Sequence, residues 1–251
     1  MPGLSVAVLA RDNEGEIADC LASVSWADEV MVILDARSRD RTAAIAKELG
    51  ARVVRHHFEN FAAQREFGLS LPRNEWLFYV DSDERATASL AQEIRQVIED
   101  DGYAGWWVPR RNFIWGREIR HGGWYPDYQL RLLRLGHARY DLARAVHEVV
   151  ILDGQEGYLR EPLLHFNYRT LGQFVAKQCQ YVGYEAEILY KQGTRPKPWT
   201  YISQPIREFW RRYVTLQGYR DGLWGLLLCA LVAYYYGFAV TVALGRRWRD
   251  G

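Results

Sequence analysis

The sequence predicts an α/β fold: a mainly parallel sheet with helices on both faces, followed by a helical C-terminal appendage. Two observations carry this prediction. Mostly apolar, strand-length runs alternate with short helical segments over residues 4–108, as in parallel strands joined by helices. From residue 169 onward the strand pattern stops, and the chain continues in helical segments that include a charge-free stretch at 222–244.

The predicted strands are short and mostly apolar. They lie at 4–10, 29–34, 51–55, 76–80 and 104–108. The predicted helices between them occupy 16–24, 41–49, 61–70 and 88–99. The first helix gathers its apolar residues on one face: Ile17, Cys20, Leu21 and Val24. The second stops at Gly50, a residue type that favours helix ends.

The second half of the chain has a different pattern. Residues 110–148 are rich in Arg, Gly, Trp and Tyr and are expected to form short strands and loops. A helix is predicted at 170–192, and the candidates for its buried side are Phe174, Cys179, Tyr181 and Tyr184. Two prolines, Pro196 and Pro198, then interrupt the chain before an aromatic and basic segment at 199–217.

The composition of the 251-residue chain is that of a globular protein, with 49% hydrophobic and 25% charged residues. Its net charge of +1 conceals two unlike halves. Residues 1–108 carry 11 Lys and Arg against 19 Asp and Glu, whereas residues 109–251 carry 21 against 12. The basic half scatters Arg among Trp and Tyr, which favours a membrane interface or an anionic ligand. No zinc-finger or RNP-like motif is present, so nucleic-acid binding is not expected.

The three cysteines, Cys20, Cys179 and Cys229, are far apart, and none lies in a CxxC motif. A disulfide framework and a zinc site are therefore not expected, and a reducing compartment fits best. The N-terminal residues combine one short apolar run with charges, unlike a signal peptide, which predicts a protein that stays in the cytosol.

Polar clusters follow three of the predicted strands, at Arg11–Glu14, Asp35–Thr42 and Asp81–Glu84. Because ligands of such sheets bind outside the carboxyl ends of the strands, we expect the clusters to converge on one edge. The sequence contains no GxGxxG and no GxxxxGK[ST] motif, which argues against a dinucleotide dehydrogenase and a P-loop NTPase.

The strongest local motif is YVDSDE at residues 79–84. Two carboxylates at the end of a buried strand can hold Mg²⁺ or Mn²⁺ at the mouth of a nucleotide site. The alternative is an acidic turn that only ends the strand. In DARSRDRT at 35–42, the first Asp can bind the ribose or base of a nucleotide, while Asp40 or Ser38 can cap the next helix.

Taken in order, several strings resemble glycosyltransferase family 2 enzymes of the GT-A fold. They are SVAVLARDNEGE, VILDARSRDRT, QRE, and WLFYVDSDE in the first half. In the second half, RRNFIWGREIRHGGWYPDYQLRLLR, AVHE, LLHFNY and REFWRRYVTLQGYRDGLWGLLL are similar to a branch that includes lipopolysaccharide-core β-1,4-glucosyltransferases. The resemblance covers residues 4–244.

The resemblance implies an inverting transfer of sugar from a nucleotide sugar, assisted by Mg²⁺ or Mn²⁺. It makes Asp83 the principal metal ligand, with Asp81 assisting it or binding the ribose. Asp35 would bind the base or ribose. The other donor-site residues implied are Arg11, Asn13, Glu14, Gln64 and Arg65. Two residues depart from the branch's pattern: Arg37 stands where a Gly is usual, and Glu66 where an Asn is usual.

Inverting transfer needs a base opposite the leaving diphosphate. The favoured candidate is Glu148 in AVHE, next to His147, and the second is Asp127 in GGWYPDYQ. The alternatives are an ion pair of Glu148 with Arg144 or Arg131, and a structural turn at Asp127. Replacement of Glu148 by Gln is expected to abolish transfer and to spare nucleotide binding.

Several further residues have two interpretations each. Arg131, with Arg110 and Arg134, can contact the diphosphate or an anionic acceptor. For Arg134, plain strand alternation is preferred. His165 is a third metal ligand, a diphosphate donor, or a buried core histidine. Trp124 and Tyr125 either stack on the acceptor sugar or pack.

The charge-free segment at 222–244 would form a helix of ~34 Å at about 1.5 Å per residue, long enough to span a bilayer. Three arginines lie on each side of it, which gives no inside–outside bias. A helix in the membrane interface, or a re-entrant pair with 199–217, is therefore preferred, with a buried core helix as the alternative.

These observations predict a donor half at 1–108, an acceptor half at 109–168, and a membrane-associating region at 169–251. The predicted reaction moves a sugar, with UDP-glucose favoured as donor, to a lipid-linked glycan such as a lipopolysaccharide core at the cytoplasmic membrane face. The alternatives are a polyprenyl-phosphate sugar transferase and a membrane-associated nucleotide-sugar-binding protein without catalysis.

Overall fold

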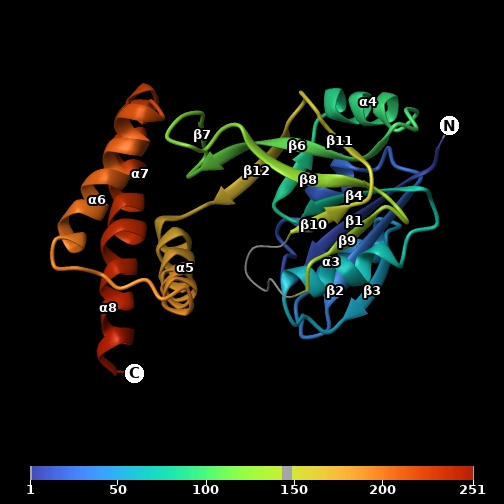
Figure 1. Ribbon diagram of the computed structural model, residues 1–251. Coiled ribbons are helices and arrows are strands. Elements are labelled where there is room, and N and C mark those ends of the chain that lie inside the picture. Colours follow the sequence, from blue (N-terminus) through green and yellow to red (C-terminus); the bar gives the residue numbers. More distant parts are fainter. Residues whose placement is uncertain (1, 143–148, 251) are drawn as a thin grey trace. The chain divides into compact units, whose positions relative to one another are not determined.

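The structure is a computed structural model that describes residues 2–142 and 149–250 (Figure 1). The chain divides into two compact units. Unit 1 contains Met1–Arg110 and Tyr128–His165, and unit 2 contains Arg111–Asp127 and Phe166–Gly251. Strands β6 and β12, defined below, each begin in unit 1 and end in unit 2.

The parallel part of the sheet is built around β1 (Leu4–Ala10). This strand pairs in parallel with β2 (Glu29–Asp35) on one side and with β4 (Trp76–Asp81) on the other, and β3 (Arg52–His56) extends the parallel sheet beyond β2. The predicted parallel strands are therefore confirmed, each to within two residues.

The other half of the sheet is mixed. β8 (Asp127–Arg134) pairs antiparallel with β4, and the strand order continues through β6 (Tyr103–Ile114), β12 (Leu163–Tyr168) and β5 (Glu84–Ala86). The short strands β7 (Arg117–Ile119) and β11 (Gln155–Tyr158) pair with β6, and β9 (Ala138–Tyr140) and β10 (Val150–Leu152) form a separate pair. β6 is longer than the strand predicted at 104–108.

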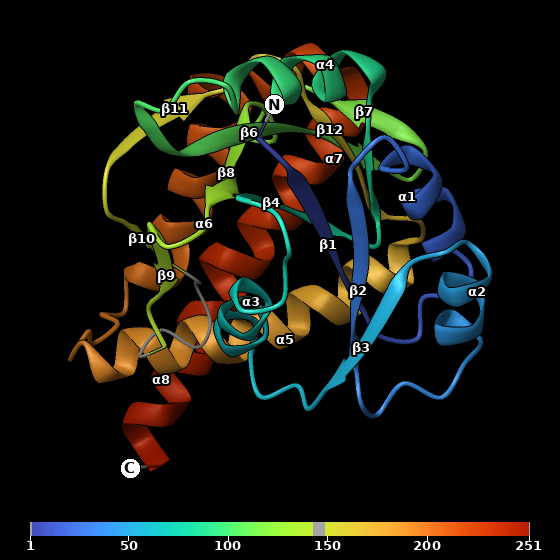
Figure 2. The same ribbon diagram turned by 90° about the vertical axis from the view of Figure 1, so that its right-hand side faces the viewer.

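Helices cover both faces of the parallel strands. On β1, Val6 and Val8 pack with helices α1 (Ile17–Ser23), α2 (Thr42–Glu48) and α4 (Ala88–Val97), whereas Ala7 and Leu9 pack on the side of α3 (Phe61–Leu69). Figure 2 shows α1 and α2 on one side of these strands and α3 on the other. Burial of both faces explains why β1, β2 and β4 are mostly apolar, whereas the edge strand β3 is only partly buried and carries Arg52, Arg55 and His56.

Unit 2 is mainly helical. Its elements are α5 (Leu171–Lys191), α6 (Thr200–Trp210), a π-helical turn η1 (Arg211–Thr215), a 3₁₀ turn η2 (Gly218–Asp221), α7 (Gly222–Val232), a π-helical stretch η3 (Ala233–Ala239) and α8 (Val240–Asp250). The last four form one helix over Gly218–Arg249. α6 lies against η3 so closely that a Cβ at Gly237 would be 2.5 Å from the Cα of Pro205. Lack of a side chain at Gly237 permits this approach.

The predicted buried side of α5 is partly wrong. Phe174 is buried as expected, but Cys179 and Tyr184 are exposed. Of the buried residues Phe174, Gln178 and Ala186, the first two are one turn apart and lie on one stripe of the helix. Cys179 is turned by about 100° from Gln178 and leaves that stripe.

Candidate active site

The carboxyl ends of the parallel strands meet at one edge of unit 1. In the strand registers, Leu9 of β1 lies opposite Ile33 of β2 and Asp81 of β4, and Ala10 lies opposite Leu34, next to Asp35. The loops that follow these strands therefore begin side by side. This confirms the expected convergence of the three polar clusters.

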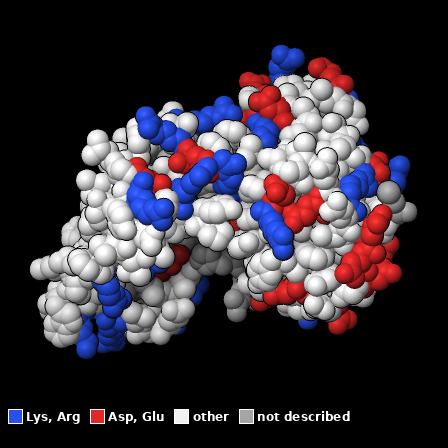
Figure 3. All heavy atoms as spheres, turned by 90° about the horizontal axis from the view of Figure 1, so that it is seen from above, with Lys and Arg blue, Asp and Glu red and all other residues white. Residues whose placement is uncertain are grey.

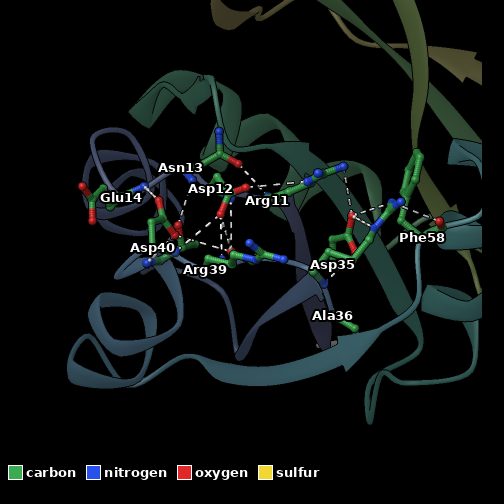
Figure 4. Close-up of polar contacts among 12 residues, drawn as sticks. Arg11, Asp12, Asn13, Glu14, Asp35, Ala36, Arg39, Asp40 and Phe58 are labelled. Atoms are coloured by element: carbon green, nitrogen blue, oxygen red, sulfur yellow. Dashed lines mark hydrogen bonds and ion pairs between the residues drawn. The ribbon is translucent and has the colours of Figure 1, made fainter.

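Asp35 ends β2 with its carboxylate buried, 2% exposed. The Arg37 guanidinium donates to it from Nη2 to Oδ2 at 2.8 Å and from Nε to Oδ1 at 3.1 Å. Arg11 reaches the same carboxylate from the first loop, with Nη1 3.5 Å from Oδ2 (Figure 4). The hydrogen bonds from Arg37 lower the pKa of Asp35 to about 2, so the carboxylate is charged at neutral pH.

The first two loops are joined by hydrogen bonds in both directions (Figure 4). The Asp12 Oδ1 accepts the backbone N–H of Arg39 at 2.8 Å, and the Asp40 Oδ2 accepts the N–H of Glu14 at 2.8 Å. In return, the Glu14 Oε2 accepts the N–H of Arg41 at 3.1 Å. Asp12 itself has a φ of +50°, a conformation that Asp tolerates better than most residues. The two loops therefore form one hydrogen-bonded structure.

Two residues predicted to line a nucleotide pocket, Asn13 and Glu14, have local partners in these loops. The Asn13 Oδ1 accepts the N–H of Arg11 at 2.7 Å, and its own N–H donates to the Thr42 Oγ1 at 2.8 Å. The predicted cap of α2 at Asp40 or Ser38 is wrong, because Arg41 holds the N-cap position and makes no side-chain cap hydrogen bond. Asp40 lies one residue earlier, where its Oδ1 accepts the N–H of Thr42, the first residue of α2, at 3.0 Å.

Asp81, the first carboxylate of the DSD turn, faces two guanidiniums. The Arg65 Nη2 lies 2.8 Å from Oδ1, and the Arg131 Nη2 lies 2.5 Å from Oδ2. Burial alone would raise the pKa of Asp81, but the charges of Arg131, Arg65 and Arg110 outweigh it and hold the pKa well below its usual range. Three predicted site residues, Arg65, Asp81 and Arg131, thus lie together.

Glu84 belongs to this group and was not identified from the sequence. Its carboxylate is fully buried and accepts the backbone N–H of Asp81 at 2.8 Å. It also pairs with the Arg110 Nη1 at 3.1 Å and lies 3.7 Å from the Arg131 Nη2. Glu84 therefore fixes the turn and the arginines around it. The only sequence signal was its position directly after DSD, since its partners are distant along the chain.

Asp83, the second carboxylate of the turn, lies next to His165. The antiparallel pairing of β12 with β5 sets His165 opposite Glu84, and the His165 Nε2 is 3.5 Å from the Asp83 Oδ2. A carboxylate oxygen and an imidazole nitrogen are ligands that Mn²⁺ accepts, so this pair fits a divalent cation. Within the described part of the chain, no group of three or more His, Cys, Asp or Glu is close enough to hold a metal by itself. A bound diphosphate or water can supply further oxygen ligands to a cation held by this pair.

The remaining predicted residues have separate surroundings. Gln64 is buried, and its Oε1 lies 2.8 Å from the His56 Nδ1. Arg134 pairs with Glu75 at 2.5 Å, in agreement with the structural interpretation preferred for it. Glu66 accepts the backbone N–H of Tyr140 at 2.6 Å.

The candidates on the acceptor side divide between unit 2 and the undescribed part of the chain. Asp127 belongs to unit 2, where the Asn112 Nδ2 lies 3.4 Å from its Oδ2. Trp124 packs against the apolar core of unit 2, whereas Tyr125 is 38% exposed. His147 and Glu148 lie outside the described residues.

Unit 2 contains one helix, Gly218–Arg249, that is long and apolar enough to cross a membrane by length and composition. Its most apolar window has a mean hydropathy of 2.0, and 39% of that window is buried. Beside it, α6 and the residue that precedes it expose four large apolar side chains: Trp199, Ile202, Ile206 and Trp210. In the space-filling view, uncharged residues cover most of the visible surface of these helices, with Lys and Arg in separate patches (Figure 3).

Comparisons with known proteins agree with the geometry of unit 1. A model of glycosyl transferase family 2 matches residues 5–165. The lipopolysaccharide core biosynthesis glycosyltransferase LpsC of Rhizobium meliloti (strain 1021) is 29% identical over 97% of this chain and 92% of its own length. An uncharacterised glycosyltransferase of Rickettsia bellii (strain RML369-C) is 24% identical over 92% of this chain and 82% of its own.

Among solved structures, glucosyl-3-phosphoglycerate synthase from Mycobacterium tuberculosis, in complex with Mn²⁺, UDP and glucosyl-3-phosphoglycerate, aligns over 45% of this chain and 44% of its own. The identity is 20% and the TM-score 0.37.

Proposed function

Because the chain belongs to glycosyl transferase family 2, we propose that it moves a hexose, with UDP-glucose as the favoured donor, to a hydroxyl of a lipid-linked envelope glycan. The observation that carries the proposal is the set of side chains gathered at the end of β4. There, Asp81 with its two arginines and the Asp83–His165 pair combine cationic donors with a metal-binding pair. A nucleoside diphosphate needs this combination because its phosphates are anionic.

In this proposal, the donor lies along the edge formed by the first, second and fourth parallel-strand ends. Asp35 accepts hydrogen bonds from the nucleoside, and Arg11 lies beside it. Arg65 and Arg131, held by Asp81, supply guanidinium N–H groups to the diphosphate. Asp83 and His165 would hold Mg²⁺ or Mn²⁺, and a cation bound there neutralises charge on the departing diphosphate.

The transfer inverts the anomeric carbon. Glu148 takes the proton of the acceptor hydroxyl as that oxygen forms its bond to the anomeric carbon, and the bond from this carbon to the diphosphate oxygen breaks with its electron pair going to the leaving group. Asp127 is the second candidate for this base. Replacement of Glu148 by Gln should abolish transfer and leave UDP binding unchanged. Substantial turnover in that variant would discard the assignment and favour a phosphate acceptor, which needs no strong base.

The acceptor is proposed to be a lipopolysaccharide core, presented at the cytoplasmic face of the membrane. The likeness to LpsC over nearly the whole of both chains supports the acceptor class. The exposed apolar side chains of α6, together with Arg207 and Arg211, support attachment to a lipid surface. Recovery of the full chain in the soluble fraction at high salt without detergent would contradict attachment.

The donor site is tested by thermal shift with UDP, GDP and CMP, each with and without Mn²⁺. A ligand at a hundred times its Kd adds about 2.7 kcal/mol of stability, which is readily detected. We expect a Mn²⁺-dependent shift with UDP that is lost in Asp83→Asn. Absence of a shift with all three nucleotides would contradict the donor site.

A further inference from the structure

The Asp35 carboxylate, on which nucleoside binding is proposed to depend, is covered by a side chain of its own loop. The Arg37 guanidinium donates to both oxygens of the Asp35 carboxylate, from Nη2 to Oδ2 at 2.8 Å and from Nε to Oδ1 at 3.1 Å. The same Nη2 donates to the Phe58 carbonyl at 3.2 Å, and the Arg37 Cζ lies 5.9 Å from the centre of the Phe58 ring. Arg37 therefore bridges the end of β2 and the segment after β3.

We propose that Arg37 limits the affinity of the donor site: its side chain is a displaceable cover on Asp35 that the nucleoside must replace in order to bind. The inference rests on the proposed function, because it takes Asp35 as the nucleoside ligand. Arg37 is also a residue at which the sequence departs from the branch it resembles, where a Gly is usual, and a Gly has no side chain that could cover the carboxylate.

The hydrogen-bonding capacity of Asp35 explains why the Arg37 guanidinium and the nucleoside cannot bind to its carboxylate at the same time. A carboxylate offers about four lone-pair sites. Arg37 occupies Asp35 with two side-chain nitrogens and with its backbone N–H, which is 3.0 Å from Oδ1, and Arg11 approaches from another side. A ribose hydroxyl or a base N–H can therefore reach the carboxylate only after the guanidinium has moved away.

Displacement of the cover is feasible because the two partners differ in exposure. The Arg37 side chain is 46% exposed, whereas that of Asp35 is 2% exposed. The Arg37 side chain can therefore withdraw into solvent. Asp35 then keeps its place at the end of β2, the hydrogen bond from the Arg37 backbone N–H, and the ion pair with Arg11. An ion pair with one exposed partner is weak enough to be exchanged for a ligand.

The sign of the effect separates a cover from an ordinary binding residue. A nucleoside diphosphate is an anion, so removing a nearby cation would by charge alone weaken its binding. Removing a cover has the opposite effect, because the nucleoside no longer competes with the guanidinium. Tighter binding after loss of a positive charge is therefore diagnostic.

The test is the Kd for UDP with Mn²⁺, measured by calorimetry on the full chain in detergent at fixed ionic strength. We expect Arg37→Ala to bind UDP roughly three- to tenfold more tightly than the unmodified chain. The matched control is Arg39→Ala, which removes the same charge from the same loop. Among the described residues the Arg39 side chain has no hydrogen-bond or ion-pair partner. The Kd of the Arg39→Ala variant for UDP should therefore differ less than twofold from that of the unmodified chain.

A double-mutant cycle locates the effect on the carboxylate. Asp35→Asn should weaken UDP binding, and in that background Arg37→Ala should bring no gain. Unchanged or weaker binding in Arg37→Ala, or an equal gain in the Asp35→Asn background, would overturn the inference while the donor site stands. Failure of both the unmodified chain and Arg37→Ala to bind UDP, GDP or CMP would overturn the proposed donor site, and the inference with it.

Discussion

Substitution of Glu84 by Gln tests whether the buried ion network holds the DSD turn. Glu84 is fully buried, and the side chain of its partner Arg110 is only 15% exposed. Water therefore cannot solvate the Arg110 guanidinium well once the negative charge of Glu84 has been removed. Removing one partner of such a buried pair costs about 3–5 kcal/mol. Gln retains an oxygen for the N–H of Asp81, and Arg131 retains Asp81. Because these contacts remain, we expect a loss at or just below the lower limit of that range, about 2–3 kcal/mol.

The assay is urea denaturation followed by circular dichroism, with Asp101→Asn as the control. Asp101 also pairs with an arginine, Arg134, at 3.1 Å, but its side chain is 87% exposed. An exposed pair of this kind contributes less than about 1 kcal/mol. The denaturant slopes should agree between variants, so that the midpoints report stability. Equal losses in Glu84→Gln and Asp101→Asn would refute the reasoning that burial makes this network important.

Three further predictions concern the strand-end site and its support. Asp83→Asn should keep the fold but lose the Mn²⁺ dependence of UDP binding, measured by calorimetry; retained dependence would assign the metal elsewhere. Because the pKa of Asp35 is lowered to about 2, its stabilising charge is present above the ordinary carboxyl pKa and is lost as the pH falls toward 2. Acid unfolding monitored by fluorescence should therefore flatten in Asp35→Asn, and an unchanged profile would contradict this. Gly68→Ala should cost about 1–3 kcal/mol in urea denaturation, since its Cβ would meet the Tyr79 hydroxyl and lie 2.7 Å from the Ile33 Cδ1. Gly183→Ala, in open space on α5, should stabilise, and a loss equal to that of Gly68→Ala would count against the clash.

The parallel strands could be predicted from the sequence because both of their faces are buried. β1, β2 and β4 are local apolar runs that can be recognised without knowledge of their neighbours, and β3 at the edge retains the apolar pair Val53 and Val54. The position of β8 between β4 and β6 could not be predicted in this way. Strand order in a mixed sheet depends on pairing between strands that are far apart in the sequence, and residues 110–148 carry no pattern that indicates which strand they pair with.

The site shows the same division between local and distant information. Asp35, Asp81 and Asp83 could be proposed as site residues because strand ends are local features, and the strand registers place these ends at one edge. Glu84 was missed because its function depends on Arg110 and Arg131, which reach it from other strands.

The roles of Asn13 and Glu14 were also beyond the sequence. The resemblance implied that both side chains line a nucleotide pocket, but it could not indicate that these residues would bond to groups of the neighbouring loop. Those bonds follow from the approach of two loops, which is a tertiary property.

In the proposed donor site, the joined loops after β1 and β2 constrain how donor preference can change. Asp12 and Glu14 hold the backbone of the second loop, and Asp40 holds the backbone of the first. A loop grafted alone from a relative would bring its own side chains but would lose the acceptors that shaped its path. A change of donor, whether by engineering or by natural mutation, is therefore expected to need coordinated changes in residues 11–14 and 35–42.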